Sequence, residues 1–574
     1  MGLFSTFNIG RLALSAHQTA MQVTGQNIAN ASNENYTRQR AIFETTPAQD
    51  LTYAQLGTGV CVAEIQRVID ETLEARIDGA GSSLADLMAQ QEILDQIEAI
   101  FNELSDTDLS STLSEFFDAL EALTTDPEDS STRLELISAA ETLRDSLRYI
   151  ATQLNETREN TDDAIQIAVN DINEITNQIA QLNAQIMVAE NGGVNTGTAN
   201  DLRDKRAALV RDLAELVEIR TVETGAGSLN VLAGSDFLVF GNDSFALTTT
   251  QDADRGVLVS TAEFEHNGAD LAINGGKLAG LITGRDDIAG GFVDDIAAFA
   301  EQLIYEMNRI HTEGRGIDGL SDVTSTGRVS SSLVELDQAG LNFSVVNGSF
   351  VLNVQNENTG ETKSINVSID LDGIGSDSTL DSVVTEINTE LNAAFGGSSP
   401  VTASITGTNR LRVASSTDAY TFSFSEDTSG FLAAIGTNTF FTGYDALNID
   451  VNDMVRDNPD LIAAAFSDVP GGNGNALRMA ELRNSLVFDN GTATFEDYYQ
   501  GVVGSLGIQA ASAQDRVDNQ ALLMTSLLNE RERVSGVNLD EETINLISHQ
   551  RAYQAAARLI TVADSLIETL LNML

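Results

Sequence analysis

Cysteine and histidine, which often act as nucleophiles, bases and metal ligands, are scarce in this 574-residue chain. Cys61 is the only cysteine, which excludes a disulfide framework and any zinc or iron–sulfur site built from cysteines. The four histidines, His17, His266, His311 and His549, are scattered, and no two have metal-ligand spacing. His311 lies near the end of a predicted helix, where we expect it to cap the helix C-terminus. These residues predict no metal centre and no cofactor.

Three glycine-rich or acidic motifs also fail as binding sites. Gly275-Gly-Lys-Leu has the lysine of a phosphate-binding loop but lacks the earlier glycine and the following Ser or Thr. Gly225-Ala-Gly-Ser-Leu-Asn lacks the last position of the dinucleotide fingerprint. Asp370-Leu-Asp-Gly-Ile-Gly has the wrong glycine spacing for an EF-hand loop, and no Glu closes it. We expect a turn there, after a strand over Ser364–Ile369, with a weak calcium contact as the alternative. No catalytic residue is predicted, so we expect no enzyme.

The charge of the chain limits its partners. Asp and Glu number 85 against 31 Lys and Arg, which gives a formal net charge of −54 and argues against binding to nucleic acid. Hydrophobic residues make up 42%, too many for a disordered acidic polymer. Two explanations of the charge stay open, adaptation to saline surroundings and drift on exposed loops. No apolar run is long enough for a membrane span, and the first residues do not resemble a cleavable signal peptide.

Helical patterns occupy both ends of the chain, and β patterns occupy its middle. The pattern is helical from the start to about Arg220, β-rich over about 221–274, and helical again over 278–311. A second β-rich stretch covers about 329–441, and helices follow to the last residue. Within it, Val346-Asn-Gly-Ser predicts a hairpin turn, Thr379–Phe395 a helix, and Thr402–Val413 a return to strand. We therefore predict an α+β multidomain fold.

The clearest helical periodicity runs from Ile165 to Ala189, where apolar residues recur every three or four positions. Asn191-Gly-Gly then breaks the helix, and a second apolar stripe begins at Leu202. This pattern predicts an antiparallel helical hairpin within a bundle.

The two ends of the chain carry matching apolar seams. Burying five N-terminal side chains yields roughly 10 kcal/mol, whereas ordering the segment costs on the order of 28 kcal/mol in backbone entropy. The N-terminal helix therefore needs a partner, and we predict that the two terminal helices pair as an α-helical coiled coil, in the monomer or on assembly. The alternative is that each docks separately on the rest of the protein. The predicted assembly-interface residues are Leu3, Phe7, Leu14, Met21, Ile28, Leu546, Tyr553, Ile560, Ile567 and Leu570, with Gly10, His17, Thr24, His549, Ala556 and Ala563 completing the seams.

Two pairs of motifs at the ends suggest a family. Asn27-Ile-Ala-Asn-Ala precedes Tyr36-Thr-Arg-Gln, and Val537-Asn-Leu-Asp-Glu-Glu precedes Gln550-Arg-Ala-Tyr-Gln-Ala-Ala-Ala-Arg. These motifs resemble the terminal signatures of bacterial flagellar axial proteins, which are the rod, hook and hook-associated proteins. One departure is Glu34-Asn35, where the family commonly has Pro-Gly.

Interior segments narrow the resemblance to the family of flagellar hook-associated protein 1, the hook–filament junction proteins. The stretch from Leu341 to Gly436 is least covered by it. The segments are Asn200-Asp-Leu-Arg-Asp-Lys-Arg, Gly275-Gly-Lys-Leu-Ala-Gly-Leu, Asn308-Arg-Ile-His-Thr-Glu-Gly, Phe440-Phe-Thr-Gly, Thr494-Phe-Glu-Asp-Tyr-Tyr and Gly504-Ser-Leu-Gly.

The resemblance implies a structural subunit of the extracellular flagellum, exported without a cleavable signal peptide and needed for filament assembly. The implied partners are further copies in a helical tier, the hook protein, the second junction protein (hook-associated protein 3) and an export chaperone at the C-terminal helix. The alternatives are another axial protein such as the hook protein, or an acidic secreted adhesin with a coiled-coil stalk. Hook proteins are not expected to have the hairpin over Ile165–Val217.

We expect three domains. Residues 1–35 with 535–574 form a terminal coiled-coil domain that lines the inner tube. Residues 36–320 with 441–534 form a helical-bundle domain, which includes a β subdomain at about 221–275. Residues 321–440 form an outer, β-rich inserted domain.

Overall fold

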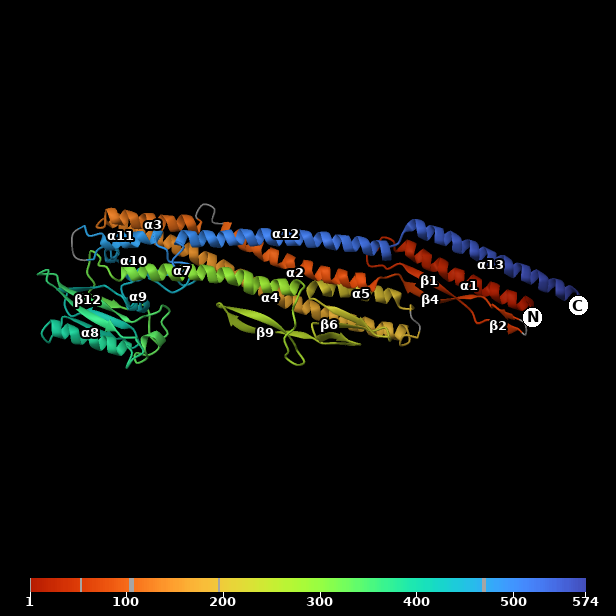
Figure 1. The fold of residues 1–574 in the computed structure, drawn as a ribbon, viewed down its shortest axis with the longest axis horizontal. Coiled ribbons are helices and arrows are strands. Elements are labelled where there is room, and N and C mark those ends of the chain that lie inside the picture. Colours follow the sequence, from red (N-terminus) through yellow and green to blue (C-terminus); the bar gives the residue numbers. More distant parts are fainter. Residues whose placement is uncertain (1, 52–53, 103–107, 195–196, 467–470, 574) are drawn as a thin grey trace. The chain divides into compact units, whose positions relative to one another are not determined.

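The computed structural model describes residues 2–51, 54–102, 108–194, 197–466 and 471–573, without the side chains of 2–3, 51, 54, 102 and 570–573. The chain divides into two compact units. Unit 1 contains Met1–Leu94, Arg158–Ile288 and Ala510–Leu574, and unit 2 contains Asp95–Thr157 and Ala289–Gln509. Terminal helices and a β-rich middle give the predicted α+β fold (Figure 1). Within the described ranges, no helix combines the length and hydropathy that a bilayer span needs.

Helices dominate unit 1. The α4 and α5 helices form the predicted hairpin, with Asn191 and Gly192 at positive φ in the turn between them. Ile165, Ile172 and Ile179 from the predicted seam are fully buried. The helices that contribute to this unit are α1 (Gly2–Ala29), α2 (Glu71–Asn102), α4 (Ser130–Ala189), α5 (Asn200–Leu216), α6 (Lys277–Thr283), the π-helix η1 (Gly284–Ala289), α12 (Phe495–Ser535) and α13 (Leu539–Met573).

The expectation of a helical pattern from the start to Arg220 is wrong over residues 39–67. Here β1 (Gln39–Thr45) pairs antiparallel with β4 (Val60–Arg67), and β2 (Gln49–Leu51) pairs with β3 (Ala54–Leu56). Pro47 disfavours helix, and Val60, Val62 and Ile65 favour strand. The β1–β4 hairpin lies beside α1 (Figure 1).

The β-rich pattern predicted over about 221–274 is confirmed. Its strands are β5 (Arg220–Glu223), β6 (Leu229–Ala233), β7 (Asp236–Phe240) and β8 (Asp243–Ser244) in one sheet, and β9 (Leu247–Asp254) with β10 (Val257–Phe264) in another.

Asparagine side chains on α4 tie these strands to the helix. The Asn173 amide donates to the Leu247 carbonyl at 2.8 Å and accepts from the Leu247 N–H at 2.7 Å. Asn183 makes the same two bonds with Leu229, at 2.8 and 3.0 Å. Each side chain thus satisfies backbone groups at the end of a strand as a neighbouring strand would.

The β-rich part of unit 2 contains two three-stranded sheets and α8. The sheet orders are β13-β12-β16 and β11-β15-β14, and β17 pairs with β18. Fully buried phenylalanines, among them Phe350, Phe422 and Phe431, fill the core. The strands are β11 (Asp322–Thr324), β12 (Gly348–Asn356), β13 (Thr362–Ile369), β14 (Val401–Ile405), β15 (Leu411–Ser415), β16 (Tyr420–Ser425), β17 (Phe441–Thr442) and β18 (Asp450–Val451). The helices of unit 2 are α3 (Leu109–Thr125), α7 (Gly290–His311), α8 (Leu380–Ala394), α9 (Phe431–Ile435), α10 (Asp453–Asp457) and α11 (Gly474–Glu481), with 3-10 turns η2 (Leu336–Gln338), η3 (Pro459–Leu461) and η4 (Leu482–Asn484).

Of two local predictions in the β-rich part of unit 2, the helix is confirmed and the hairpin turn is wrong. The expected helix over Thr379–Phe395 is confirmed as α8, which Thr379 and Ser382 begin with a reciprocal capping box. The hairpin turn predicted at Val346-Asn-Gly-Ser is wrong, because Gly348 begins β12 and its hairpin partner β13 follows later. The Asn347 side chain instead accepts a hydrogen bond from the Leu371 N–H.

The helix-capping role expected for His311 is also wrong. This residue is the last of α7, and its side chain is fully buried. The Nδ1–H donates to the Asn438 carbonyl at 2.9 Å, and Nε2 accepts from the Ala463 N–H at 3.1 Å. Burial lowers the pKa of His311 to about 4, so the ring is neutral at pH 7 and joins three segments of unit 2.

Candidate assembly site

The α1 and α13 helices lie side by side and antiparallel, with the two chain ends at the same end of the pair (Figure 1). Near that end, a Cβ added at Gly10 would lie 2.7 Å from Cγ1 of Ile560. Further along, His17 faces His549, and Asn27 bonds to Glu542. The order of these contacts shows that the helices follow each other over most of their length.

The predicted seam residues are only partly covered. On α1, Leu14, Met21 and Ile28 are half-buried, and Phe7 is 38% exposed. The side chains of Leu3 and Leu570 lie outside the described residues. On α13, the half-buried members are Leu546, Tyr553, Ile560 and Ile567.

Small residues make the most buried apolar positions of the pair. Ala16, Ala20 and Val23 on α1 are buried, as are Ala556 and Ala563 on α13. The α1 helix also packs against β1 and β4, so its covered face is wider than one helix–helix seam.

A cluster of polar residues ties the start of α13 to the end of α1. Asn27 is 1% exposed, and its amide oxygen accepts from the Tyr36 hydroxyl at 2.8 Å and the Gln39 N–H at 3.0 Å. Its amide nitrogen donates to the Gln39 carbonyl and to Glu542 Oε2, both at 2.9 Å. All four hydrogen-bonding positions of this buried side chain are therefore used.

Glu542 is the second centre of the cluster. Its side chain is 3% exposed and accepts from Arg38, whose Nη2 lies 2.8 Å from Oε1. The Arg38 backbone N–H donates to the carbonyl of Ser535, the last residue of α12. Burial raises the pKa of Tyr36, and the carboxylates of Asp204 and Glu542 raise it further, so the phenol stays protonated and donates to Asn27.

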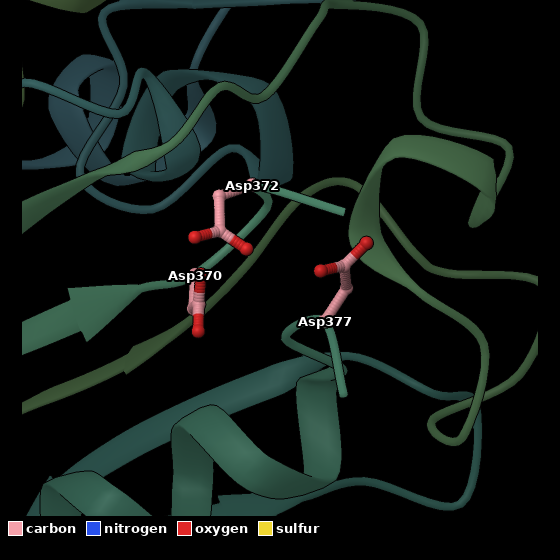
Figure 2. A group of neighbouring side chains, drawn as sticks. All are labelled: Asp370, Asp372 and Asp377. Atoms are coloured by element: carbon pink, nitrogen blue, oxygen red, sulfur yellow. The ribbon is translucent and has the colours of Figure 1, made fainter. Parts of the chain in front are cut away.

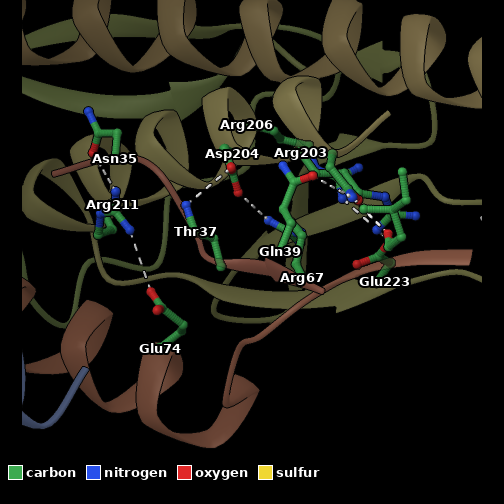
Figure 3. Close-up of polar contacts among 12 residues, drawn as sticks. Asn35, Thr37, Gln39, Arg67, Glu74, Arg203, Asp204, Arg206, Arg211 and Glu223 are labelled. Carbon is green, nitrogen blue, oxygen red and sulfur yellow. Dashed lines mark hydrogen bonds and ion pairs between the residues drawn. The ribbon is translucent and has the colours of Figure 1, made fainter. Parts of the chain in front are cut away.

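A second network joins the segment after α1 to α5 (Figure 3). Asp204 accepts from the Thr37 N–H at 3.3 Å and from Arg67 Nη1 at 3.0 Å. Arg211 donates to Asn35 Oδ1 at 2.6 Å, so the Asn that replaces the family's glycine is used as an acceptor. Arg203 forms ion pairs with Glu223 and, at 2.8 Å, with Glu190, and lowers the pKa of Glu190.

Large apolar side chains remain exposed on the rest of α13. Ile544 is 66% exposed and Val562 is 59% exposed, which is unusual for a helix that is paired along its length. The exposed apolar face of α13 consists of Ile544, Ile547, Leu559, Val562 and Leu566.

The acidic turn after β13 brings three carboxylates together. Ligand oxygens of Asp370, Asp372 and Asp377 all lie within 4.8 Å of one another (Figure 2). Asp372 accepts from the Ile374 N–H and Asp377 from the Gly373 N–H, which stabilises the turn. The expected turn after the strand is therefore present, and its own hydrogen bonds account for two of the carboxylates.

Sequence reasoning missed Asn27, Arg38, Asp204 and Glu542 as site residues. Asn27 and Glu542 are 515 residues apart, so no spacing rule connects them. The available signal was their place in the motifs that carried the resemblance, together with their polarity on or beside an apolar seam.

Comparisons with known proteins agree with the resemblance. Residues 94–325 match the model of the family described as flagellar hook-associated protein FlgK helical domain. Residues 531–573 match the model described as flagellar basal body rod FlgEFG protein C-terminal.

Curated relatives match over almost the whole chain. Flagellar hook-associated protein 1 of Bacillus subtilis (strain 168) is 26% identical over 582 residues, which cover 99% of this chain and 98% of that protein. Flagellar hook-associated protein 1 of Salmonella typhimurium (strain LT2) is 27% identical over 595 residues, which cover 99% of this chain and 100% of that protein. The flagellar hook junction protein FlgK from Burkholderia pseudomallei has a similar fold, with a TM-score of 0.53 and 16% identity over 80% of this chain and 100% of that one.

Proposed function

Because the chain belongs to the family of flagellar hook-associated protein 1, we propose that it joins the hook to the filament and is needed for filament assembly. Members of this family are structural components of the extracellular flagellum and not enzymes. The observation that carries the proposal is the similarity over 99% of the chain, which includes the motifs that meet around Asn27 and Glu542.

The terminal pair is the proposed assembly module. Residues 1–35 with 535–574 form a coiled-coil domain of the inner tube, and the exposed apolar face of α13 contacts neighbouring copies in a helical tier. The exposure of Ile544 and Val562 supports this, because burial of each such side chain stabilises a contact by about 1.5–3 kcal/mol. If the apolar face of α13 contacts a different surface on the neighbouring copy, the contact is head-to-tail, and repeated head-to-tail contacts build helical arrays.

The other two domains keep the boundaries inferred from the sequence. Residues 36–320 with 441–534 form the bundle, including the β subdomain at about 221–275, and residues 321–440 form the outer insert. The compact core around Phe350 and Phe422 supports an insert that folds by itself.

The proposed partners are the hook protein on one side and hook-associated protein 3 on the other. An export chaperone binds the C-terminal helix before secretion, which occurs without a cleavable signal peptide. The apolar face of α13 supports this, since a chaperone would shield it in the cell. Deletion of residues 540–574 is expected to abolish chaperone binding in a pull-down, and undiminished binding would contradict this assignment.

The hook protein is the nearest alternative, and the match at 531–573 by itself fits rod and hook proteins as well. The helical hairpin of α4 and α5 lies within the match to the hook-associated helical domain, which favours the junction protein. An acidic adhesin has no such support.

Genetic complementation tests the function. In a strain that lacks the corresponding gene, the wild-type chain is expected to restore filaments, and Ile560→Asp is expected to fail because it places a charge in the α1–α13 contact. Leu333→Asp is the matched control, since Leu333 is 72% exposed in the proposed outer insert. Urea unfolding of both purified variants checks that the rest of the chain is folded. Normal filaments with Ile560→Asp would contradict the proposal.

A further inference from the structure

Two imidazoles face each other between the terminal helices. Nδ1 of His17 on α1 lies 3.4 Å from Nδ1 of His549 on α13, although the residues are 532 positions apart in the sequence. The ring centroids are 5.6 Å apart. Both side chains are half-buried, so the pair is partly screened from solvent.

An aromatic ring from a third element holds the two imidazoles. The Phe43 ring on β1 lies 5.4 Å from the His17 ring and 5.9 Å from the His549 ring, measured between centroids. The Phe43 ring thus contacts both imidazoles in tilted aromatic pairs.

The distance between the nitrogens is that of two ligands on one metal ion. Hydrogen bonds from N–H donors are usually about 2.7–3.2 Å long. Two imidazole nitrogens on one tetrahedral zinc ion, each about 2.0–2.1 Å from the metal, are about 3.3–3.4 Å apart. The Nδ1–Nδ1 distance of 3.4 Å matches the spacing of two ligands on one ion and is also that of a long hydrogen bond.

We propose that His17 and His549 bind a divalent transition-metal ion of the zinc type through their Nδ1 atoms and so link α1 to α13. Imidazole is a preferred ligand of zinc, copper and nickel, and the net charge of −54 attracts cations to the chain. The site rests on the proposed pairing of α1 with α13. A bound ion would stabilise the paired state by mass action.

Glu542 does not act as a third ligand. It lies seven positions before His549 and thus near the same face of α13, but both its carboxylate oxygens already accept bonds from Asn27 and Arg38. Its negative charge nevertheless favours a cation beside His549. The protein ligands are therefore the two imidazoles.

Calorimetric titration of the full-length, chelator-treated protein with ZnCl2 tests the site. Excess Mg²⁺ occupies carboxylate clusters such as Asp370, Asp372 and Asp377, which prefer hard cations. The wild-type protein is expected to bind one equivalent of Zn²⁺. His17→Gln and His549→Gln are each expected to weaken binding at least about tenfold. His266→Gln is the matched control, because His266 is exposed and packs against Phe245 and Phe264 instead.

Equal Zn²⁺ affinity and stoichiometry in all four proteins would overturn the proposal. A cross-link separates this failure from a failure of helix pairing. Gly10→Cys with Ile560→Cys, in a Cys61→Ser background, is expected to form a disulfide because these positions adjoin. A disulfide without Zn²⁺ binding at the histidines would refute the metal site alone. Absence of the disulfide would refute both the metal site and the pairing on which the proposed function rests.

Discussion

The β-rich part of unit 2 and the terminal helix pair bury their apolar residues to different extents. Phe350, Phe422 and Phe431 are at most 1% exposed, and they belong to one hydrophobic core that one chain completes. On α13, by contrast, Ile544 and Val562 stay more than half exposed. The first region is stabilised by its own packing, whereas the second retains apolar surface that neighbouring molecules are expected to cover.

The largest expected effect lies in the β-rich core. Phe350→Ala removes a fully buried ring that stacks on Phe431, and it should lower the free energy of unfolding by about 3–5 kcal/mol. Urea unfolding of the full-length protein measures this loss. Leu333→Ala is the control and should change stability by less than about 0.5 kcal/mol. Similar losses of unfolding free energy in Phe350→Ala and Leu333→Ala would contradict the claim that the buried core stabilises this region.

Acid should weaken unit 2 through His311. Its folded pKa of about 4 lies below the unfolded value of 6.5, so the unfolded chain binds the proton more tightly. Stability is therefore fully present above pH 6.5 and decreases by about 3 kcal/mol as the pH falls to 4. His311→Gln should remove this part of the pH dependence. An unchanged slope in that variant would contradict the buried neutral imidazole.

The polar cluster at the start of α13 should affect the terminal pair alone. Glu542→Ala removes one of the two acceptors of the buried Asn27 amide nitrogen and the buried ion-pair partner of Arg38, and it should destabilise the pair by about 2–3 kcal/mol. Hydrogen exchange of α1 and α13 measures the effect, and exchange in β12–β16 should not change. Glu541→Ala is the matched control, because that side chain is 58% exposed in its ion pair with Arg38. Equal effects of the two substitutions would contradict the role of the cluster.

The smallest effect concerns the strand contacts of α4. Asn173→Leu leaves both backbone groups of Leu247 unpaired and should cost about 1–2 kcal/mol in urea unfolding. Asn170→Leu, at an exposed position on the same helix, should have little effect. A loss with Asn170→Leu as large as with Asn173→Leu would mean that the side-chain bonds are not responsible.

Local patterns predicted the elements whose signals lie within one segment. The seam from Ile165 to Ala189 and the capped helix after Thr379 both depend on neighbours a few residues away, and both are present. The β1–β4 hairpin was missed because its short strands lie between two long helices, although Val60, Val62 and Ile65 favour strand. Strand formation there depends on packing against α1, which the local pattern does not reveal.

Contacts between the ends of the chain were the hardest to predict. The seams indicated that the ends need partners, but they did not indicate that Gly10 lies against Ile560 or that Asn27 bonds to Glu542. His17 and His549 gave no metal-ligand spacing in the sequence, yet their rings meet. Each of these polar residues interrupts an apolar stripe, and such interruptions are the feature that sequence reasoning should have examined.

Hydrogen exchange of the free protein and of purified hook–filament junctions tests the central claim most directly. The claim is that folding completes the β-rich core and that assembly completes the terminal pair. Amides of α1 and α13 should exchange faster than those of β12–β16 in the free protein and become strongly protected in the junction. Protection of α1 and α13 that is already complete in the free protein and unchanged in the junction would contradict the account.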